Sequence, residues 1–141
     1  MQFPAPEPGL VIRFNYLWRR EQQEGRDNAR YARPCAVVLT VRREADGNLM
    51  TLVAPITHSP PTNETVALRL PDRVKAHLGL DAEPSWIVAD EVNEFAWPGF
   101  DLEPNAAGDI AYGFLPPKLY EQMKSMIVEQ VRLGRLGPVP R

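Results

Sequence analysis

The sequence predicts a mainly β protein with some α structure (class α+β), folded as a small curled antiparallel barrel, with an open α+β sheet as the alternative. Three observations support this prediction. Five short segments carry strand-like patterns, a short helix is inserted between the fourth and the fifth, and one longer helix follows near the C-terminus. The chain also has 15 prolines in 141 residues. Proline breaks helices and central strands, so short elements and firm turns are expected.

The composition indicates one globular domain covering residues 1–141, because 44% of the residues are hydrophobic and 24% are charged. The proline-rich residues 1–8 are expected to form a loose N-terminal arm, and residues 134–141 a C-terminal tail. No apolar run approaches the roughly 20 residues of a membrane span, and the N-terminus lacks the features of a signal peptide. A single cysteine, Cys35, favours a reducing compartment. We therefore expect a cytoplasmic protein that does not contact a membrane.

The first half of the chain predicts three strands. Alternating apolar residues over Leu10 to Trp18 predict the first strand. The polar segment from Arg19 to Ala32 predicts a long mobile loop. The next two strands, Cys35–Arg42 and Leu49–Ile56, flank the hairpin-turn sequence Asp46-Gly47-Asn48, so they are expected to be antiparallel neighbours.

The second half predicts two further strands and two helices. A fourth strand is expected over Val66–Leu70. The fifth, Ser85–Val92, is apolar on both faces, which is typical of a central strand. Between them, a proline and a glycine delimit a short helix, Asp72–Leu78. Residues 95–109 are expected to be irregular.

The longest helix is predicted to begin at Pro116 or Pro117 and to end at Gly134. One face of this helix is expected to pack on the sheet because apolar residues recur there at helical spacing. The residues on that face are Leu119, Met123, Met126, Ile127 and Gln130.

The candidate site lies where the two hairpin strands meet at their open end. In an antiparallel hairpin the start of the first strand lies beside the end of the second, so Arg33 is expected near Thr57. A guanidinium presents planar donors that match phosphate oxygens in a fork, and the hydroxyls of Thr57 and Ser59 can donate to non-bridging oxygens. These residue types therefore suit a phosphodiester. The plainer alternative is that Arg33 is an exposed arginine at the rim, or one paired with Asp90 or Glu91.

His58 is the candidate general acid or base, because imidazole titrates near neutrality. In an extended segment, however, Thr57 and His58 project to opposite faces, which argues against both entering one cleft. The chain has two histidines and one cysteine with no close pairing, so we expect neither a metal site nor a cofactor.

The loop from residue 19 to residue 32 supplies further candidates. The acidic residues of the loop are Glu21, Glu24 and Asp27. They are either solvated charges, or one of them folds over Arg33 and serves as the base for a hydroxyl. Arginines and aromatic residues in and beside this loop suit single-stranded nucleic acid, which binds by ionic contact and stacking. The residues that we expect to contact RNA are Trp18, Arg19, Arg20 and Arg30.

Several motifs together resemble those of the PemK/MazF toxins of toxin–antitoxin modules. In chain order they are Gly9-Leu10-Val11, Arg33-Pro34, Ala54-Pro55-Ile56-Thr57, Val66-Ala67-Leu68, Leu78-Gly79-Leu80 and the strand Ser85–Val92 with its acidic residues. The resemblance covers residues 9–133. The chain is similar to a divergent member of that family, since its loop before Arg33-Pro34 is longer than usual.

This resemblance implies an SH3-like barrel, usually a homodimer, that acts as a metal-independent endoribonuclease on single-stranded RNA. In such toxins the ribose 2′-hydroxyl attacks the adjacent phosphorus and leaves a cyclic phosphate and a 5′-hydroxyl, so RNA is cut and DNA is not. The family's catalytic arginine matches Arg33, and its threonine or serine matches Thr57. Glu24, His58 and Ser59 are the candidates for a supporting role. A cognate antitoxin protein is expected to occupy the RNA groove.

The alternative function is a non-catalytic SH3-like module, because a fold does not determine a function. Such a module would bind a protein partner or RNA through an aromatic rim. The residues of that rim would be Trp18, Trp86 and Trp97.

Overall fold

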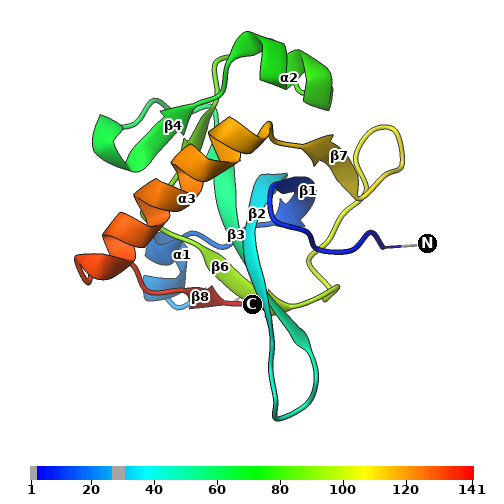
Figure 1. Ribbon diagram of the computed structural model, residues 1–141, viewed down its shortest axis with the longest axis vertical. Coiled ribbons are helices and arrows are strands. Elements are labelled where there is room, and N and C mark those ends of the chain that lie inside the picture. The colour runs from blue at the N-terminus through cyan, green and yellow to red at the C-terminus, as the bar shows by residue number, and fades with distance from the viewer. Residues whose placement is uncertain (1–2, 27–30) are drawn as a thin grey trace.

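The computed structural model describes residues 3–26 and 31–141 and confirms a mainly β architecture (Figure 1). In the described part of the chain, eight strands form one curled sheet, a half-barrel whose main path runs β4-β5-β3-β2-β1-β7. Off this path, β6 pairs with β3 and β8 pairs with β6. The strands are β1 (Leu10–Asn15), β2 (Ala32–Arg42), β3 (Leu49–Thr57), β4 (Ala67–Arg69), β5 (Trp86–Val88), β6 (Asn93–Ala96), β7 (Ala111–Phe114) and β8 (Val139–Pro140). The helices are α1 (Arg19–Gln23), the 3-10 turn η1 (Glu64–Val66), α2 (Asp72–Leu78) and α3 (Pro117–Arg132).

The β2–β3 hairpin is the longest part of the sheet, and its predicted antiparallel pairing is confirmed. Cys35 lies opposite Pro55 near the open end, and Arg42 lies opposite Leu49 near the turn. Figure 1 shows the hairpin turn at the bottom of the molecule and α2 at the other end. Since both strands run the full length of the sheet, they determine which residues meet at its far end.

The curl of the sheet arises where β3 changes partner along its second edge. Met50–Val53 of β3 pair with β6, and Ile56 and Thr57 pair with β5. Pro55 lies at this changeover and has no N–H to donate, so a continuous ladder on both edges cannot form there. As a result β5 is central, between β3 and β4, as its apolar character on both faces predicts.

Helix α3 covers one face of the sheet, as the spacing of its apolar residues predicts (Figure 1). Met123 has no exposed surface, and Leu119 and Ile127 are buried beside it. Tyr120 fixes the helix to the sheet, because its hydroxyl donates to the Val38 carbonyl at 2.7 Å. The helix begins at Pro117, as predicted, and ends at Arg132, before Gly134.

A second core fills the inner side of the curl. It centres on Phe14, Tyr16 and Phe95, and the rings of Phe14 and Phe95 lie 4.6 Å apart. Cys35 belongs to this core and is fully buried, and burial raises the pKa of its thiol above the ordinary value. It therefore packs as a small apolar residue, as its place in an apolar run indicates.

Several predicted strand boundaries were wrong. The first strand ends at Asn15, not at Trp18, because Leu17 pairs with the Asn93 side chain in place of a strand. The fifth covers only Trp86–Val88, and residues 95–109 are not wholly irregular because β6 extends to Ala96. β7 was not predicted. These short strands depend on partners that are distant in sequence.

The two ends of the chain differ from each other. Residues 3–8 form no helix or strand, and Pro6 among them is buried. The C-terminal segment is not a free tail, however. Val139 pairs with Asn93 and is 2% exposed, and the Arg141 guanidinium lies 2.8 Å from Asp101. None of the helices in the described residues combines the length and the apolar character needed to cross a bilayer.

Candidate functional site

The predicted convergence of Arg33 and Thr57 is confirmed by the register of the hairpin. Cys35 pairs with Pro55, and the same antiparallel register continued by two residues brings Arg33 opposite Thr57. Both side chains border a cleft of about 480 Å³, the main cleft, at the end of the sheet away from the hairpin turn. Ser59 borders it too, and its backbone N–H donates to the Thr57 hydroxyl oxygen at 3.2 Å. That hydroxyl therefore keeps its own proton for a ligand in the cleft.

Within the described residues, Arg33 contacts an aromatic ring and no acidic side chain. Its guanidinium lies 4.9 Å from the centre of the Trp18 ring. Among the described residues its buried Nε atom has no hydrogen-bond partner, and no carboxylate is within ion-pair distance. The predicted alternative, a pair with Asp90 or Glu91, is therefore not formed. An arginine with unused donors at a cleft is suited to bind an anion.

Trp18 supports two guanidiniums and is mostly covered. The Arg20 guanidinium lies 5.1 Å from the centre of the Trp18 ring, and the Arg33 guanidinium lies 4.9 Å from it. Trp18 itself is only 9% exposed. Arg19 is not among the residues that line the main cleft, and its guanidinium donates to the Asp90 carbonyl at 2.7 Å. Of the loop arginines predicted to contact RNA, Arg20 alone is described as lining this cleft. Arg30 and Asp27 lie outside the described residues.

The segment predicted as a long loop contains the short helix α1. Glu21 explains this helix, because its carboxylate accepts from the Trp18 N–H at 3.1 Å and caps the first turn. Glu21 also lies 3.5 Å from Arg26 and is 8% exposed, so its role is structural. Glu24 differs, since its side chain is 63% exposed. It borders a second cleft of about 260 Å³, the α1 cleft, which it shares with Arg33.

His58 follows the last residue of β3, so strand alternation does not govern it, and the expectation of opposite faces was wrong. It borders the main cleft together with Thr57. Its Nε2 lies 2.9 Å from Asp81 and its Nδ1 lies 3.3 Å from Glu83. His58 therefore holds the segment 81–83 against the end of β3, and neither nitrogen is free to act as a base.

The His58 cluster contains the side chains best suited to hold a metal in the described residues. Ligand atoms of His58, Asp81 and Glu83 lie within 4.8 Å of one another, and all three residues are exposed. The Lys75 ammonium lies 3.0 Å from Asp81 and competes with a cation for that carboxylate. Burial raises the pKa of Asp81, and hydrogen bonds from Lys75 and His58 lower it by more, so it stays below its ordinary value. Both carboxylates of the cluster are thus already paired with a basic side chain, Asp81 with His58 and Lys75, and Glu83 with His58.

Glu91 links the start of α1 to Tyr16, which follows β1. One carboxylate oxygen accepts from the Tyr16 hydroxyl and from the Arg19 N–H, both at 3.0 Å. Burial raises the pKa of Glu91 above its ordinary value, by more than these hydrogen bonds from Arg19 and Tyr16 lower it. The sequence pattern does not reveal this link, since Glu91 is 75 residues from Tyr16 and 72 from Arg19.

Replacing Glu91 with glutamine is expected to make stability less dependent on pH. With a raised carboxyl pKa, the folded state binds more protons than the unfolded state, so stability falls as pH rises from the ordinary value through the raised one. Glutamine keeps the acceptor oxygen and does not titrate. From about pH 4 to about pH 7, the free energy of unfolding of the variant should therefore rise relative to wild type, by about 1.4 kcal/mol per unit of raised pKa.

Urea unfolding at several pH values measures this difference. Glu44→Gln, at an exposed position, is the control and should leave the pH dependence unchanged. A Glu91→Gln curve parallel to wild type across that range would show that the carboxylate is solvated in the folded state.

The chain matches no protein-family model, and no curated protein matches it in sequence. The functional assignment therefore depends on the residues of the cleft and on their geometry.

Proposed function

We propose that this protein is a metal-independent endoribonuclease of the PemK/MazF type, with an SH3-like barrel and the role of the toxin in a cytoplasmic toxin–antitoxin module. The observation that supports it best is the position of Arg33. Its Nε has no hydrogen-bond partner among the described residues, and its side chain lines the main cleft together with Thr57. In this proposal the active form is a homodimer, and a cognate antitoxin protein competes with RNA for the cleft.

The proposed reaction is an in-line displacement at phosphorus. The ribose 2′-oxygen forms a bond to phosphorus while the bond to the 5′-oxygen breaks, which leaves a cyclic phosphate and a 5′-hydroxyl. Arg33 stabilises the negative charge that develops on the phosphoryl oxygens, and Thr57 donates a hydrogen bond to one of them. The 2′-hydroxyl loses a proton to a base, and the 5′-oxygen takes up one from solvent.

Glu24 is our candidate for that base. It is exposed, and within the described residues its ion-pair partner, the Arg26 Nε, is 4.0 Å away, so its carboxylate is available. It also shares the α1 cleft with Arg33. His58 is less suited because both of its ring nitrogens face carboxylates. Ser59 supports the site indirectly, since its N–H orients the Thr57 hydroxyl.

Thr57→Val is expected to slow RNA cleavage about 10²-fold, because it removes one hydrogen bond to the charged transition state without changing the size of the side chain. Thr57→Ser keeps the hydroxyl and should retain most of the activity. The assay uses labelled single-stranded RNA of varied sequence in the presence of EDTA, and the products are analysed for cyclic phosphate ends.

The same assay separates the proposal from its alternative. A DNA oligonucleotide of matching sequence is the control substrate and should stay intact, since it lacks the 2′-hydroxyl. Pure protein that binds RNA but leaves every sequence intact would exclude the nuclease and favour a non-catalytic module. For that module, Trp18 and Trp86 share the main cleft, but Trp97 packs 5.9 Å from Phe95 and does not border it.

A further inference from the structure

We infer that Trp86 and Arg69 form a binding subsite for one unpaired RNA base and its phosphate, next to the reactive pair Arg33 and Thr57. The inference rests on the proposed function, because it assigns the nucleotide that flanks the bond to be cut. It concerns residues that no motif of the sequence analysis connects with Arg33.

The register of the sheet arranges these four residues in one row. Trp86 of β5 lies opposite Thr57 of β3 on one side and opposite Arg69 of β4 on the other. The β2–β3 register, continued two residues past Cys35 and Pro55, brings Arg33 of β2 to the far side of Thr57, and both line the main cleft. Residues directly opposite each other in a sheet project to the same face. The row across four strands therefore reads cation, aromatic ring, hydroxyl, cation.

The spacing of the row suits neighbouring parts of one nucleotide chain. Adjacent strands lie about 4.8 Å apart, so Trp86 is two strands, or roughly 10 Å, from Arg33. A phosphate held by Arg33 and Thr57 would thus have its neighbouring base over Trp86. Arg69, one strand further, would meet the next phosphate.

Trp86 is the aromatic residue of the main cleft that remains open to a ligand. It is half-buried and borders the cleft, whereas Trp18 is only 9% exposed and already carries two guanidiniums. The Arg69 guanidinium lies 6.0 Å from the centre of the Trp86 ring, at the outer limit of a cation–π contact. Bases of any sequence stack on such a ring, so it suits single-stranded nucleic acid.

The charge around the ring also favours a phosphate chain. Arg20 and Arg33 line the main cleft, and Arg69 adds a third cation beside Trp86. Asp90 is the acidic residue described in the lining of this cleft. Within the described residues Arg69 is exposed and forms no ion pair, so its charge is available. This local positive charge occurs in a chain whose net charge is −2.

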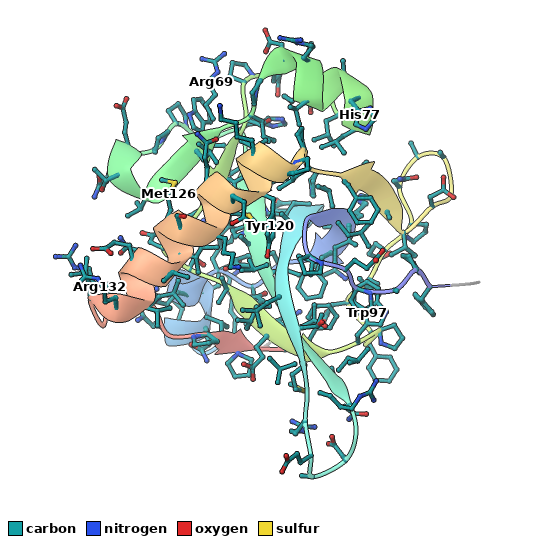
Figure 2. All side chains as sticks on the ribbon, viewed as in Figure 1. Arg69, His77, Trp97, Tyr120, Met126 and Arg132 are labelled. Carbon is teal, nitrogen blue, oxygen red and sulfur yellow. The ribbon has the colours of Figure 1, made fainter. Side chains whose placement is uncertain are left out.

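Trp97 is a matched control for Trp86. Figure 2 shows Arg69 at the upper edge of the molecule and Trp97 at the opposite, lower side, near the β2–β3 hairpin. Trp97 is also partly buried, but it packs on Phe95 and does not border the main cleft. A change at Trp97 therefore removes a comparable ring from outside the proposed subsite.

The experiment measures binding separately from cleavage. The probe is a short, mixed-sequence 2′-O-methyl RNA, which has no 2′-hydroxyl and cannot be cut by the proposed reaction. Trp86→Leu is expected to weaken its binding about 10-fold, because stacking on one aromatic ring is lost. Trp86→Phe should bind nearly as well as wild type, and Trp97→Leu should bind equally well. Circular dichroism confirms that each variant is folded.

A second variant tests the phosphate contact. Arg69→Ala is expected to reduce the slope of log affinity against log salt by about 0.7, the value for one phosphate on a single strand. Arg69→Lys should keep the slope. With cleavable RNA, both Trp86→Leu and Arg69→Ala should raise KM more than they lower kcat.

The outcomes separate the subsite from the nuclease. If Trp86→Leu binds the probe as tightly as wild type, or if wild type does not bind it, the subsite is rejected, even where RNA is cut. If binding depends on Trp86 and wild type cuts no RNA, the subsite stands and the proposed reaction is rejected.

Discussion

Arg33→Ala is expected to lower the rate of RNA cleavage about 10²- to 10³-fold, because it removes the charged donor that faces the transition state. In the described residues Arg33 has no ion pair, and its Nε has no hydrogen-bond partner, so the fold loses little with the side chain. The measurement is the single-turnover rate in EDTA, together with the thermal unfolding midpoint of each variant.

Arg33→Lys should remain strongly impaired. A lysine keeps the positive charge but has no planar fork of donors, and it does not stack on the Trp18 ring as a guanidinium does. Activity in the lysine variant close to wild type would mean that only charge is needed at this position.

Arg42→Ala is the matched control for Arg33→Ala. Arg42 is in the same strand, and its guanidinium donates to the Gly47 carbonyl in the hairpin turn, far from the cleft. Its removal should leave cleavage unchanged. If Arg33→Ala cuts RNA as fast as Arg42→Ala, Arg33 is not catalytic, and the proposed reaction must be abandoned.

Asn93→Ala is expected to lower the free energy of unfolding by about 2–4 kcal/mol. Asn93 has no exposed surface, and its amide pairs with both backbone groups of Leu17. Its Oδ1 accepts from the Leu17 N–H at 2.8 Å, and its Nδ2 donates to the Leu17 carbonyl at 2.8 Å. The variant leaves two buried backbone groups unpaired, each of which costs about 1–3 kcal/mol.

Urea unfolding measures this loss, and Asn48→Ala is its control. Asn48 is exposed in the hairpin turn, so its change should stay within about 0.5 kcal/mol. Asn93→Asp should also destabilise, because it keeps the acceptor but removes the donor and buries a charge. An Asn93→Ala variant as stable as wild type would show that water pairs with both groups of Leu17.

The same variant links stability to the site. Leu17 precedes Trp18, whose ring carries Arg33 and Arg20 at the edge of the main cleft. Asn93 thus holds the segment on which the position of Arg33 depends. In Asn93→Ala the rate of RNA cleavage should fall even under conditions where most of the protein is folded.

The parts of the fold that follow from local sequence were predicted well. The β2–β3 hairpin is specified by a turn sequence between two apolar runs, and α2 and α3 by their proline starts and glycine ends. The approach of Arg33 to Thr57 follows from the hairpin alone, because antiparallel pairing brings those two ends together. No contact from elsewhere in the chain is needed for that prediction.

The remaining features required the whole fold. The acidic partners of His58 and the position of Trp86 opposite Thr57 depend on residues that strand pairing and turns bring together, which the pattern of the sequence does not reveal. β7 and β8 are four and two residues long, too short for a period to be visible, and they exist because a neighbouring edge has unpaired groups.

The sequence alone therefore determined the approach of Arg33 to Thr57, the proposed reactive pair, since a hairpin is a local structure whose turn residues and alternation can be read directly. The tertiary structure decided what surrounds that pair. It leaves Arg33 without an acid among the described residues, engages both nitrogens of His58, and sets Trp86 beside Thr57. These outcomes depend on long-range register and burial, where a shift of one residue would turn each side chain to the other face of the sheet.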